Sequence, residues 1–252
     1  MRLARVAHAG GVAFASVEGE ELLEIADHPF GQPNYTGKRF SLADVRLLAP
    51  ILPSKVIAIG RNYAAHAAEM GNEVPDSPMM FLKPSTSVIG PNAAIRLPAA
   101  SQRVEFEGEL AVVIGQPVRN VKPSQASAAI LGYTIANDVT ARDLQKADGQ
   151  WGRAKGFDTF CPLGPWIETA VDASDLAIRT EVDREVKQDS RTALLIHKIP
   201  DLVEFVSGVM TLLPGDVILT GTPAGVGQII DGQSVSITVE GIGTLTNPVQ
   251  NA

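Results

Sequence analysis

Residues 104–115 read Val-Glu-Phe-Glu-Gly-Glu-Leu-Ala-Val-Val-Ile-Gly, and they form the longest strand pattern in the chain. The second half of the stretch is apolar at every position, which indicates a central strand buried on both faces. The first half carries Glu105, Glu107 and Glu109. Because alternate residues of a strand share a face, these carboxylates should point the same way, about 7 Å apart in succession.

Three aligned carboxylates on a buried strand need a positive partner. Like charges repel and raise one another's pKa unless a cation lies among them. A solvated edge strand is the alternative interpretation, and the apolar continuation argues against it. Oxygen ligands favour a hard ion such as Mg²⁺, Mn²⁺ or Ca²⁺ over a thiolate-bound zinc. Asp138 follows an apolar strand and is a candidate third ligand, with an ordinary helix cap as its alternative role.

Composition narrows the class of protein. The 252 residues are 45% hydrophobic, enough for one large domain or for one with a small appendage. The net charge of −7 provides no general field for phosphates, so nucleic-acid binding is not expected. Cys161 is the single cysteine and fits a buried small residue in a reducing cytoplasm. No segment approaches the ~20 apolar residues of a membrane helix.

The element pattern predicts a strand-rich α+β fold. Numerous glycines and prolines indicate many turns, and the lack of regular βαβ alternation argues against a doubly wound sheet. Pro50 and Pro53 bracket a boundary between a small N-terminal domain, 1–52, and a larger domain, 53–252. Helices are predicted at 63–70 (capped by Asn62 and stopped by Gly71), 123–130, the start of 139–150, and 200–213. Strands are predicted at 2–7, 12–17, 55–60, 79–83, 87–89, 104–115, 132–137, 166–168, 177–182, 217–220, 234–239 and 244–246.

Seven short motifs, taken in order, resemble the fumarylacetoacetate hydrolase family. The likeness is to its short, single-module branch of acylpyruvate hydrolases, oxaloacetate decarboxylases and 2-hydroxyhepta-2,4-diene-1,7-dioate isomerases. Each motif alone is weak, but together they cover roughly residues 53–248. The motifs are 60–63 with His66 and Glu69, 81–84, 107–115, 132–134, 137–145, 154–158 and 214–223.

The resemblance selects a ligand set that strand periodicity could not select. It implies that Glu107, Glu109 and Asp138 hold Mg²⁺ or Mn²⁺. Glu105 stands where the family usually has aspartate, outside the ligand set. The resemblance also implies a mostly antiparallel, distorted β-roll with peripheral helices, and a homodimer.

His66 and Glu69 are spaced i, i+3 and should share one helix face. A surface ion pair is the ordinary interpretation of this spacing. The resemblance implies instead a dyad in which Glu69 orients the imidazole and the imidazole deprotonates a water. It also places the pair on a mobile lid, residues 62–72, that closes over the substrate.

Three further residues are assigned by the resemblance, and two arginines are additional candidates. Lys155, otherwise a surface lysine, would stabilise developing enolate charge beside the keto oxygen. Gln145 and Thr222 would line the pocket. Arg61 and Arg142 are candidates either to bind a distal carboxylate or to brace the acidic residues structurally, and bracing is slightly favoured for Arg142.

One turn departs from the family pattern. Relatives often carry Asn-Gly in the hairpin before a glutamine, a pair that suits positive φ. Here Asp183 and Arg184 precede the retained Gln188, so an altered hairpin is expected.

The expected function is divalent-metal-dependent cleavage of a C–C bond in a small 2-oxo acid through a metal-bound enolate. Acylpyruvate-type hydrolysis and oxaloacetate-type decarboxylation share that electron sink, so the sequence separates them poorly. The alternative is an isomerase or decarboxylase of unsaturated 2-oxo dicarboxylic acids from aromatic catabolism. A non-catalytic metal-binding scaffold is the remote alternative.

Overall fold

The computed structural model describes residues 1–252 and is rich in strands, as predicted. The strands are β1 (Arg2–His8), β2 (Gly11–Glu18), β3 (Glu21–Ile25), β4 (Tyr35–Ser41), β5 (Arg46–Leu47), β6 (Val56–Gly60), β7 (Met79–Lys83), β8 (Val88–Ile89), β9 (Ile95–Leu97), β10 (Val104–Phe106), β11 (Gly108–Ile114), β12 (Ile130–Asn137), β13 (Thr140–Ala141), β14 (Cys161–Glu168), β15 (Ala177–Val182), β16 (Glu185–Arg191), β17 (Val217–Leu219), β18 (Gly227–Gln228), β19 (Ser234–Val239) and β20 (Gly243–Asn251). The α-helices are α1 (Ala64–Glu69), α2 (Ala126–Ala129), α3 (Arg142–Asp148), α4 (Gly152–Lys155) and α5 (Ile199–Val209). Short 3-10 turns occupy Leu42–Asp44, Ser85–Ser87, Pro123–Gln125 and Thr192–Leu194.

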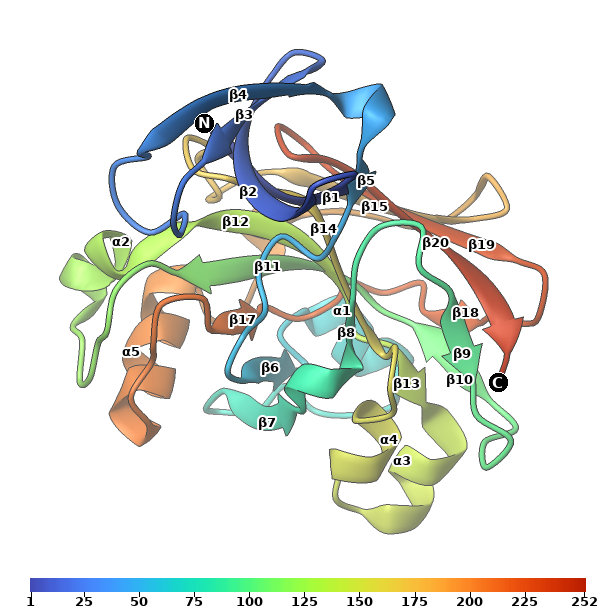
Figure 1. Ribbon diagram of the computed structural model, residues 1–252. Helices are drawn as coiled ribbons and strands as arrows, with labels where there is room; N and C mark the ends of the chain where they lie inside the picture. Colours follow the sequence, from blue (N-terminus) through green and yellow to red (C-terminus); the bar gives the residue numbers. More distant parts are fainter.

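The strands form three sheets with short helices at the periphery (Figure 1). The largest has 12 strands, with the main order β4-β3-β2-β1-β14-β12-β11-β17-β6-β7, and the others have five and three. Neighbouring strands are antiparallel except in the pairs β17–β6, β14–β8 and β20–β9. This mixed, mostly antiparallel arrangement confirms the predicted fold class.

Strand β11 lies at the centre of the large sheet, between β12 and β17, and every residue in it is buried. Its alternating side chains enter two different cores. Leu110 and Val112 belong to the larger apolar cluster, whereas Ala111 and Val113 belong to a second one. Burial of β11 on both faces therefore explains the apolar run in the sequence, as predicted.

The prediction of one continuous strand over 104–115 is wrong. Strand β10 pairs with β13 and β18 in the three-stranded sheet, and β11 begins only after Glu107. At the break, the Glu107 amide donates to Asn137 Oδ1 at 2.9 Å, and the Glu107 carbonyl accepts from the Asp138 amide at 2.9 Å. These bonds replace the regular ladder and let the chain change sheets.

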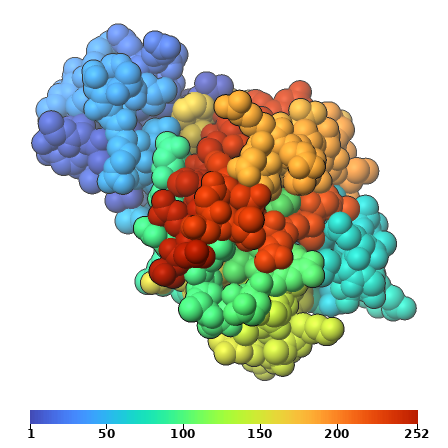
Figure 2. Space-filling model, turned by 90° about the vertical axis from the view of Figure 1, so that its right-hand side faces the viewer, coloured from blue at the N-terminus to red at the C-terminus, as the bar shows by residue number.

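The N-terminal strands form a lobe at one end of the molecule, coloured blue in Figure 2. The lobe has a small apolar cluster of its own, which includes Val6, Ala15 and Leu22. Its sheet is nevertheless continuous with the rest, because β1 pairs with β14 at Leu3 and Ile167. The domain division at residue 52 stays a prediction, as does the homodimer.

Two helix boundaries differ from the sequence prediction. Tyr63, not Asn62, is the N-cap of α1, because the Asn62 amide instead donates to the carbonyls of Thr220 (2.8 Å) and His197 (3.0 Å). Helix α5 ends at Val209 rather than at residue 213, and Leu212 beyond it forms a β-bridge. No helix in the structure has the length and apolar character needed to cross a membrane.

The hairpin between β15 and β16 is not altered, contrary to expectation. Asp183 and Arg184 have φ angles of 51° and 71°, so both central residues are left-handed, as a type I′ turn requires. The Asp183 carboxylate accepts a hydrogen bond from the Ser234 amide at 2.9 Å. That contact stabilises the turn without glycine.

Candidate active site

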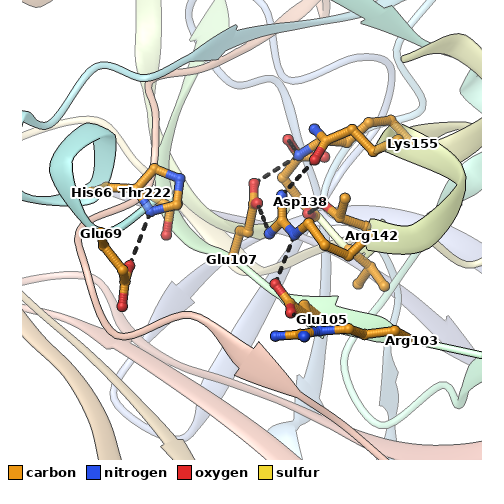
Figure 3. Close-up of polar contacts among 12 residues, drawn as sticks. His66, Glu69, Arg103, Glu105, Glu107, Asp138, Arg142, Lys155 and Thr222 are labelled. Atoms are coloured by element: carbon orange, nitrogen blue, oxygen red, sulfur yellow. Dashed lines mark hydrogen bonds and ion pairs between the residues drawn. The ribbon is translucent and has the colours of Figure 1, made fainter. Parts of the chain in front are cut away.

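Three buried carboxylates converge at the break between β10 and β11, and Figure 3 shows two of them, Glu107 and Asp138. They belong to Glu107 at the break, Glu109 on β11 and Asp138 just after β12. One oxygen from each lies within 4.8 Å of the others. The pairing of β11 with β12 brings them together, since Gly108 is opposite Asn137. The residues that the family resemblance selected as metal ligands thus share one cluster.

Two buried lysines lie against these carboxylates. Lys155 Nζ donates to Glu107 Oε2 and to Asp138 Oδ2, both at 2.7 Å. Lys83 Nζ donates to Asp138 Oδ1 at 2.6 Å and to the Lys155 carbonyl at 2.5 Å. Lys155 is therefore no surface lysine. Lys83 was not predicted to take part in the site, although a lysine that ends the apolar strand β7 was a usable signal.

Arg142 connects the outer part of the acidic stretch to the cluster. Its Nε donates to Glu105 Oε2 at 2.7 Å, its Nη2 to Glu107 Oε1 at 2.5 Å, and its Nη1 to Gln145 Oε1 at 2.7 Å. Glu105 also accepts from Arg103 at 2.6 Å, so two arginines neutralise it. These hydrogen bonds hold the acidic side chains in place, which is the bracing role considered for Arg142. They also separate Glu105 from the three-carboxylate cluster.

Glu107 and Glu109 are equally deep in the protein but electrostatically different. Burial acts to raise the pKa of the Glu107 carboxyl, but Lys155 and Arg142 outweigh it and hold that pKa well below its usual range. Burial raises the pKa of Glu109 well above its usual range, and the charges of Asp138 and Glu107 raise it further. The Glu109 side chain accepts one hydrogen bond, from the Gly221 amide at 2.6 Å. No side-chain cation forms an ion pair with it, and the nearby Lys155 charge offsets the rise in its pKa only in part.

This arrangement fits a hard divalent cation. The cluster offers carboxylate oxygens alone, which is the donor set that Mg²⁺, Mn²⁺ and Ca²⁺ prefer. Glu109 is a buried acid that is stabilised in its charged form only if a cation arrives. Cys161, the one potential soft ligand, lies outside the cluster, and burial raises the pKa of its thiol to about 12.

His66 and Glu69 form a pair on α1 (Figure 3), and His66 lines the cavity that holds the three carboxylates. His66 Nδ1 lies 3.3 Å from Glu69 Oε2, and the His66 side chain is only 8% exposed. The Gly225 amide donates to the Glu69 carboxylate at 3.0 and 3.2 Å. At Gly225, φ is +101° and a Cβ would meet the Lys187 carbonyl oxygen at 2.0 Å, so only glycine can hold Glu69 this way.

The convergent side chains line a cavity of about 60 Å³. Every residue predicted for the site lines it except Glu69, which lies behind His66. Arg61 contributes from a left-handed backbone position, with φ of 57°, a conformation that often marks functional sites. The lining residues are Ile59, Gly60, Arg61, His66, Met70, Asn72, Glu107, Glu109, Asp138, Arg142, Gln145, Trp151, Lys155 and Thr222.

Gln188 supports the backbone of the site, a role that its sequence context did not predict. Its Oε1 accepts from the Gly108 amide at 3.0 Å, and its Nε2 donates to Thr222 Oγ1 at 2.8 Å. Thr222 Oγ1 in turn donates to the Gly108 carbonyl at 2.9 Å. Gln188 thereby fixes the backbone between Glu107 and Glu109. No local pattern indicates this contact, because Gln188 comes from a hairpin 80 residues away.

Two protein families match parts of this chain, and several relatives are similar to it in sequence. Residues 55–250 match the fumarylacetoacetate (FAA) hydrolase C-terminal family, and residues 1–50 match the Rv2993c-like N-terminal family. Protein Rv2993c of Mycobacterium tuberculosis is 61% identical over 99% of this chain and 98% of its own length. The mitochondrial oxaloacetate tautomerase Fahd2a of Rattus norvegicus is 42% identical over 82% of this chain and 70% of its own.

Solved structures share the whole fold. The 5-carboxymethyl-2-hydroxymuconate delta-isomerase of Mycobacterium smegmatis is 63% identical, with a TM-score of 0.95 and full coverage of both chains. The maleylpyruvate hydrolase of Sphingobium sp. SYK-6, solved with manganese(II) and pyruvate, is 32% identical with a TM-score of 0.83, again over both complete chains.

Proposed function

This chain belongs to the fumarylacetoacetate hydrolase family, whose members are enzymes, and we propose that it cleaves a C–C bond in a small 2-oxo acid with the help of a divalent metal ion. One observation carries the proposal. The carboxylates of Glu107, Glu109 and Asp138 share a cavity with the buried ammonium group of Lys155 and with the imidazole of His66, which pairs with Glu69 behind it.

Glu107, Glu109 and Asp138 would hold Mg²⁺ or Mn²⁺. When bound, such an ion acts as a Lewis acid toward the 2-oxo carbonyl and aligns the substrate. The manganese(II) in the maleylpyruvate hydrolase structure supports this choice for a related protein. Lys83 would keep its hydrogen bond to Asp138 and fix the orientation of that carboxylate.

The protein's own groups would then handle charge and protons. Lys155 Nζ would donate to the substrate's oxygen as enolate charge develops there. The hydrogen bond from His66 Nδ1 to Glu69 orients the imidazole so that Nε2 can take a proton from water. That water would attack a distal carbonyl, and the C–C bond would break to give an enolate that is protonated to pyruvate, together with an acid. Loss of CO₂ from a β-carboxylate reaches the same enolate without water.

A second candidate function is isomerisation of an unsaturated 2-oxo diacid. The name of the isomerase from M. smegmatis favours it, as does that of the rat oxaloacetate tautomerase. Such a reaction moves a proton between carbon atoms or between carbon and oxygen. His66 would then carry the proton itself instead of activating water.

A substrate panel distinguishes these reactions. Chelated protein would be reloaded with Mg²⁺ or Mn²⁺ and assayed with an acylpyruvate, oxaloacetate and an unsaturated 2-oxo diacid. Release of pyruvate and loss of dienol absorbance would be followed separately. We expect turnover only with metal; if the reloaded protein acts on none of these compounds, the proposal is wrong.

His66→Gln tests the role of the dyad. We expect hydrolysis to fall about 10²–10⁴-fold, because general-base catalysis is lost, while metal affinity and decarboxylation are retained. His28→Gln is the matched control, since His28 is exposed in the N-terminal lobe. Acylpyruvate cleavage at the wild-type rate in His66→Gln would remove the dyad from the mechanism.

A further inference from the structure

A second cavity lies beside the active-site cavity, and Trp151 is the residue common to both linings. The active-site cavity measures about 60 Å³, whereas the second, which is more open to solvent, measures about 360 Å³. The second cavity has an apolar wall and no carboxylate. It is lined by Met79, Met80, Phe81, Gly149, Gln150, Trp151 and Gly152.

The indole ring of Trp151 lies between the two cavities. On the active-site side it packs on Gly60, where an added Cβ would lie 2.7 Å from Trp151 Cζ3. On the other side it meets Phe81 edge to face, with ring centroids 5.1 Å apart at 73°. Gly60 lines only the small cavity and Phe81 only the large one. The ring is therefore a partition between them.

The Trp151 ring is held in a fixed position relative to Lys155, which faces the carboxylates. Trp151 is the N-cap residue of α4, and its carbonyl accepts from the Lys155 amide at 2.9 Å. Lys155 Nζ lies 5.1 Å from the centre of the Phe81 ring, which packs on Trp151. One short turn thus carries the wall of the cavity and the ammonium group that faces the carboxylates.

We propose that Trp151 sets the upper length of the substrate, so that the site takes short 2-oxo acids and excludes those with long acyl chains. The inference rests on the proposed function. The small cavity holds only a few water-sized groups, at roughly 10–15 Å³ each. Removal of the indole would join it to the larger cavity, where Met79, Met80 and Phe81 offer an apolar surface for an extended chain.

The test uses a homologous series of straight-chain acylpyruvates with the Mn²⁺-loaded protein. For the wild type, kcat/KM should fall steeply as the acyl chain grows from two to eight carbons. In Trp151→Ala the ratio of kcat/KM for the long substrate to that for the short one should rise at least ~10-fold, the effect of about one methylene in a fitted pocket. Trp151→Leu should lie between the two.

Met79→Ala is the matched control, because it enlarges the second cavity and leaves the partition in place. It should keep the wild-type length profile. Inhibition constants of unreactive straight-chain 2-oxo acids provide a readout that needs binding alone. Thermal melting confirms that each variant is folded.

The outcomes separate this inference from the proposed function. An active wild type whose length profile is unchanged in both Trp151 variants overturns the inference and leaves the function standing. A wild type that turns over no 2-oxo acid overturns the function. In that case, inhibitor binding that becomes tolerant of long chains only in the Trp151 variants would still support the partition.

Discussion

Glu24 in the N-terminal lobe and Glu109 in β11 are both buried carboxylates, with 8% and 2% exposure. Glu24 accepts from Thr36 Oγ1 at 2.6 Å and lies 3.3 Å from Lys38 Nζ. The hydrogen bond from Thr36 lowers the pKa of Glu24, and Lys38 lowers it further against the effect of burial. Burial raises the pKa of Glu109 instead, and the charges of Asp138 and Glu107 raise it further, because the hydrogen bond from the Gly221 amide and the charge of Lys155 compensate only in part.

The different surroundings of Glu24 and Glu109 distinguish a buried acid that stabilises the fold from one that awaits a ligand. Glu24 is satisfied by its own lobe, and its charge stabilises the fold locally. Glu109 lies beside two other carboxylates and has no ion-pair partner, an arrangement that costs stability in the metal-free protein. A buried acid that the fold does not neutralise marks a place for a ligand of opposite charge.

The strongest test of the contrast is Glu109→Gln. We expect Mn²⁺ affinity to fall more than about 100-fold, since one of three charged ligands is lost. The metal-free variant should melt no lower than the wild type, because the charged form of Glu109 is disfavoured there. Titration calorimetry and melting curves with and without Mn²⁺ measure both effects. Unchanged Mn²⁺ affinity would exclude Glu109 as a ligand.

Lys83→Met should have the largest effect on folding. It removes one of two buried ammonium groups from Asp138, and breaking a buried ion pair typically lowers the free energy of unfolding by about 3–5 kcal/mol. Urea unfolding of the metal-free protein measures the change. Lys38→Met is the control, because Lys38 is 68% exposed and its pairing with Glu24 should contribute less than about 1 kcal/mol. An equal loss in the free energy of unfolding in Lys83→Met and Lys38→Met would contradict the assignment of Lys83 as a stabilising partner of Asp138.

The contributions of Glu109 and Glu24 to stability should also depend on pH in opposite directions. The folded-state pKa of Glu109 is raised above 4.5, so its contribution to metal-free stability is present below 4.5 and is lost as pH rises through the folded pKa. Metal binding must release the proton, so Mn²⁺ affinity should rise over that range by at most about tenfold per pH unit. For Glu24, whose pKa is lowered, stability is present above 4.5 and is lost as pH falls through its folded pKa.

Melting curves and calorimetry across pH check these trends. In Glu109→Gln the rise of Mn²⁺ affinity with pH should be weaker than in the wild type. A wild-type affinity independent of pH would show that Glu109 is already ionised in the metal-free protein.

The smallest expected effect is that of Glu24→Gln. The amide oxygen of glutamine can still accept from Thr36, so the melting temperature should fall by less than about 4 °C. Metal affinity and catalytic rate should equal those of the wild type. A loss of metal binding in this variant would mean that the N-terminal lobe contributes to the active site.

Several parts of the site were predictable because their signals are local. The apolar run of β11 is readable from consecutive residues, and Gly71, with φ of +66°, ends the α1 turn as expected. The break at Glu107 was not predictable, because the side chain that accepts the Glu107 amide there, Asn137, lies 30 residues away in the sequence. The hairpin at Asp183 was misjudged for the same reason, since its stabilising contact comes from Ser234.

The sequence alone determined the family, the strand-rich class and the set of residues from which a metal site could be built. Those properties follow from periodicity and from short motifs, which neighbouring residues carry. Only the tertiary structure decided which glutamate each cation neutralises, and that Trp151 separates two cavities. Burial and charge pairing depend on contacts between distant segments, such as Glu109 with Gly221 across 112 residues, and no local pattern encodes them.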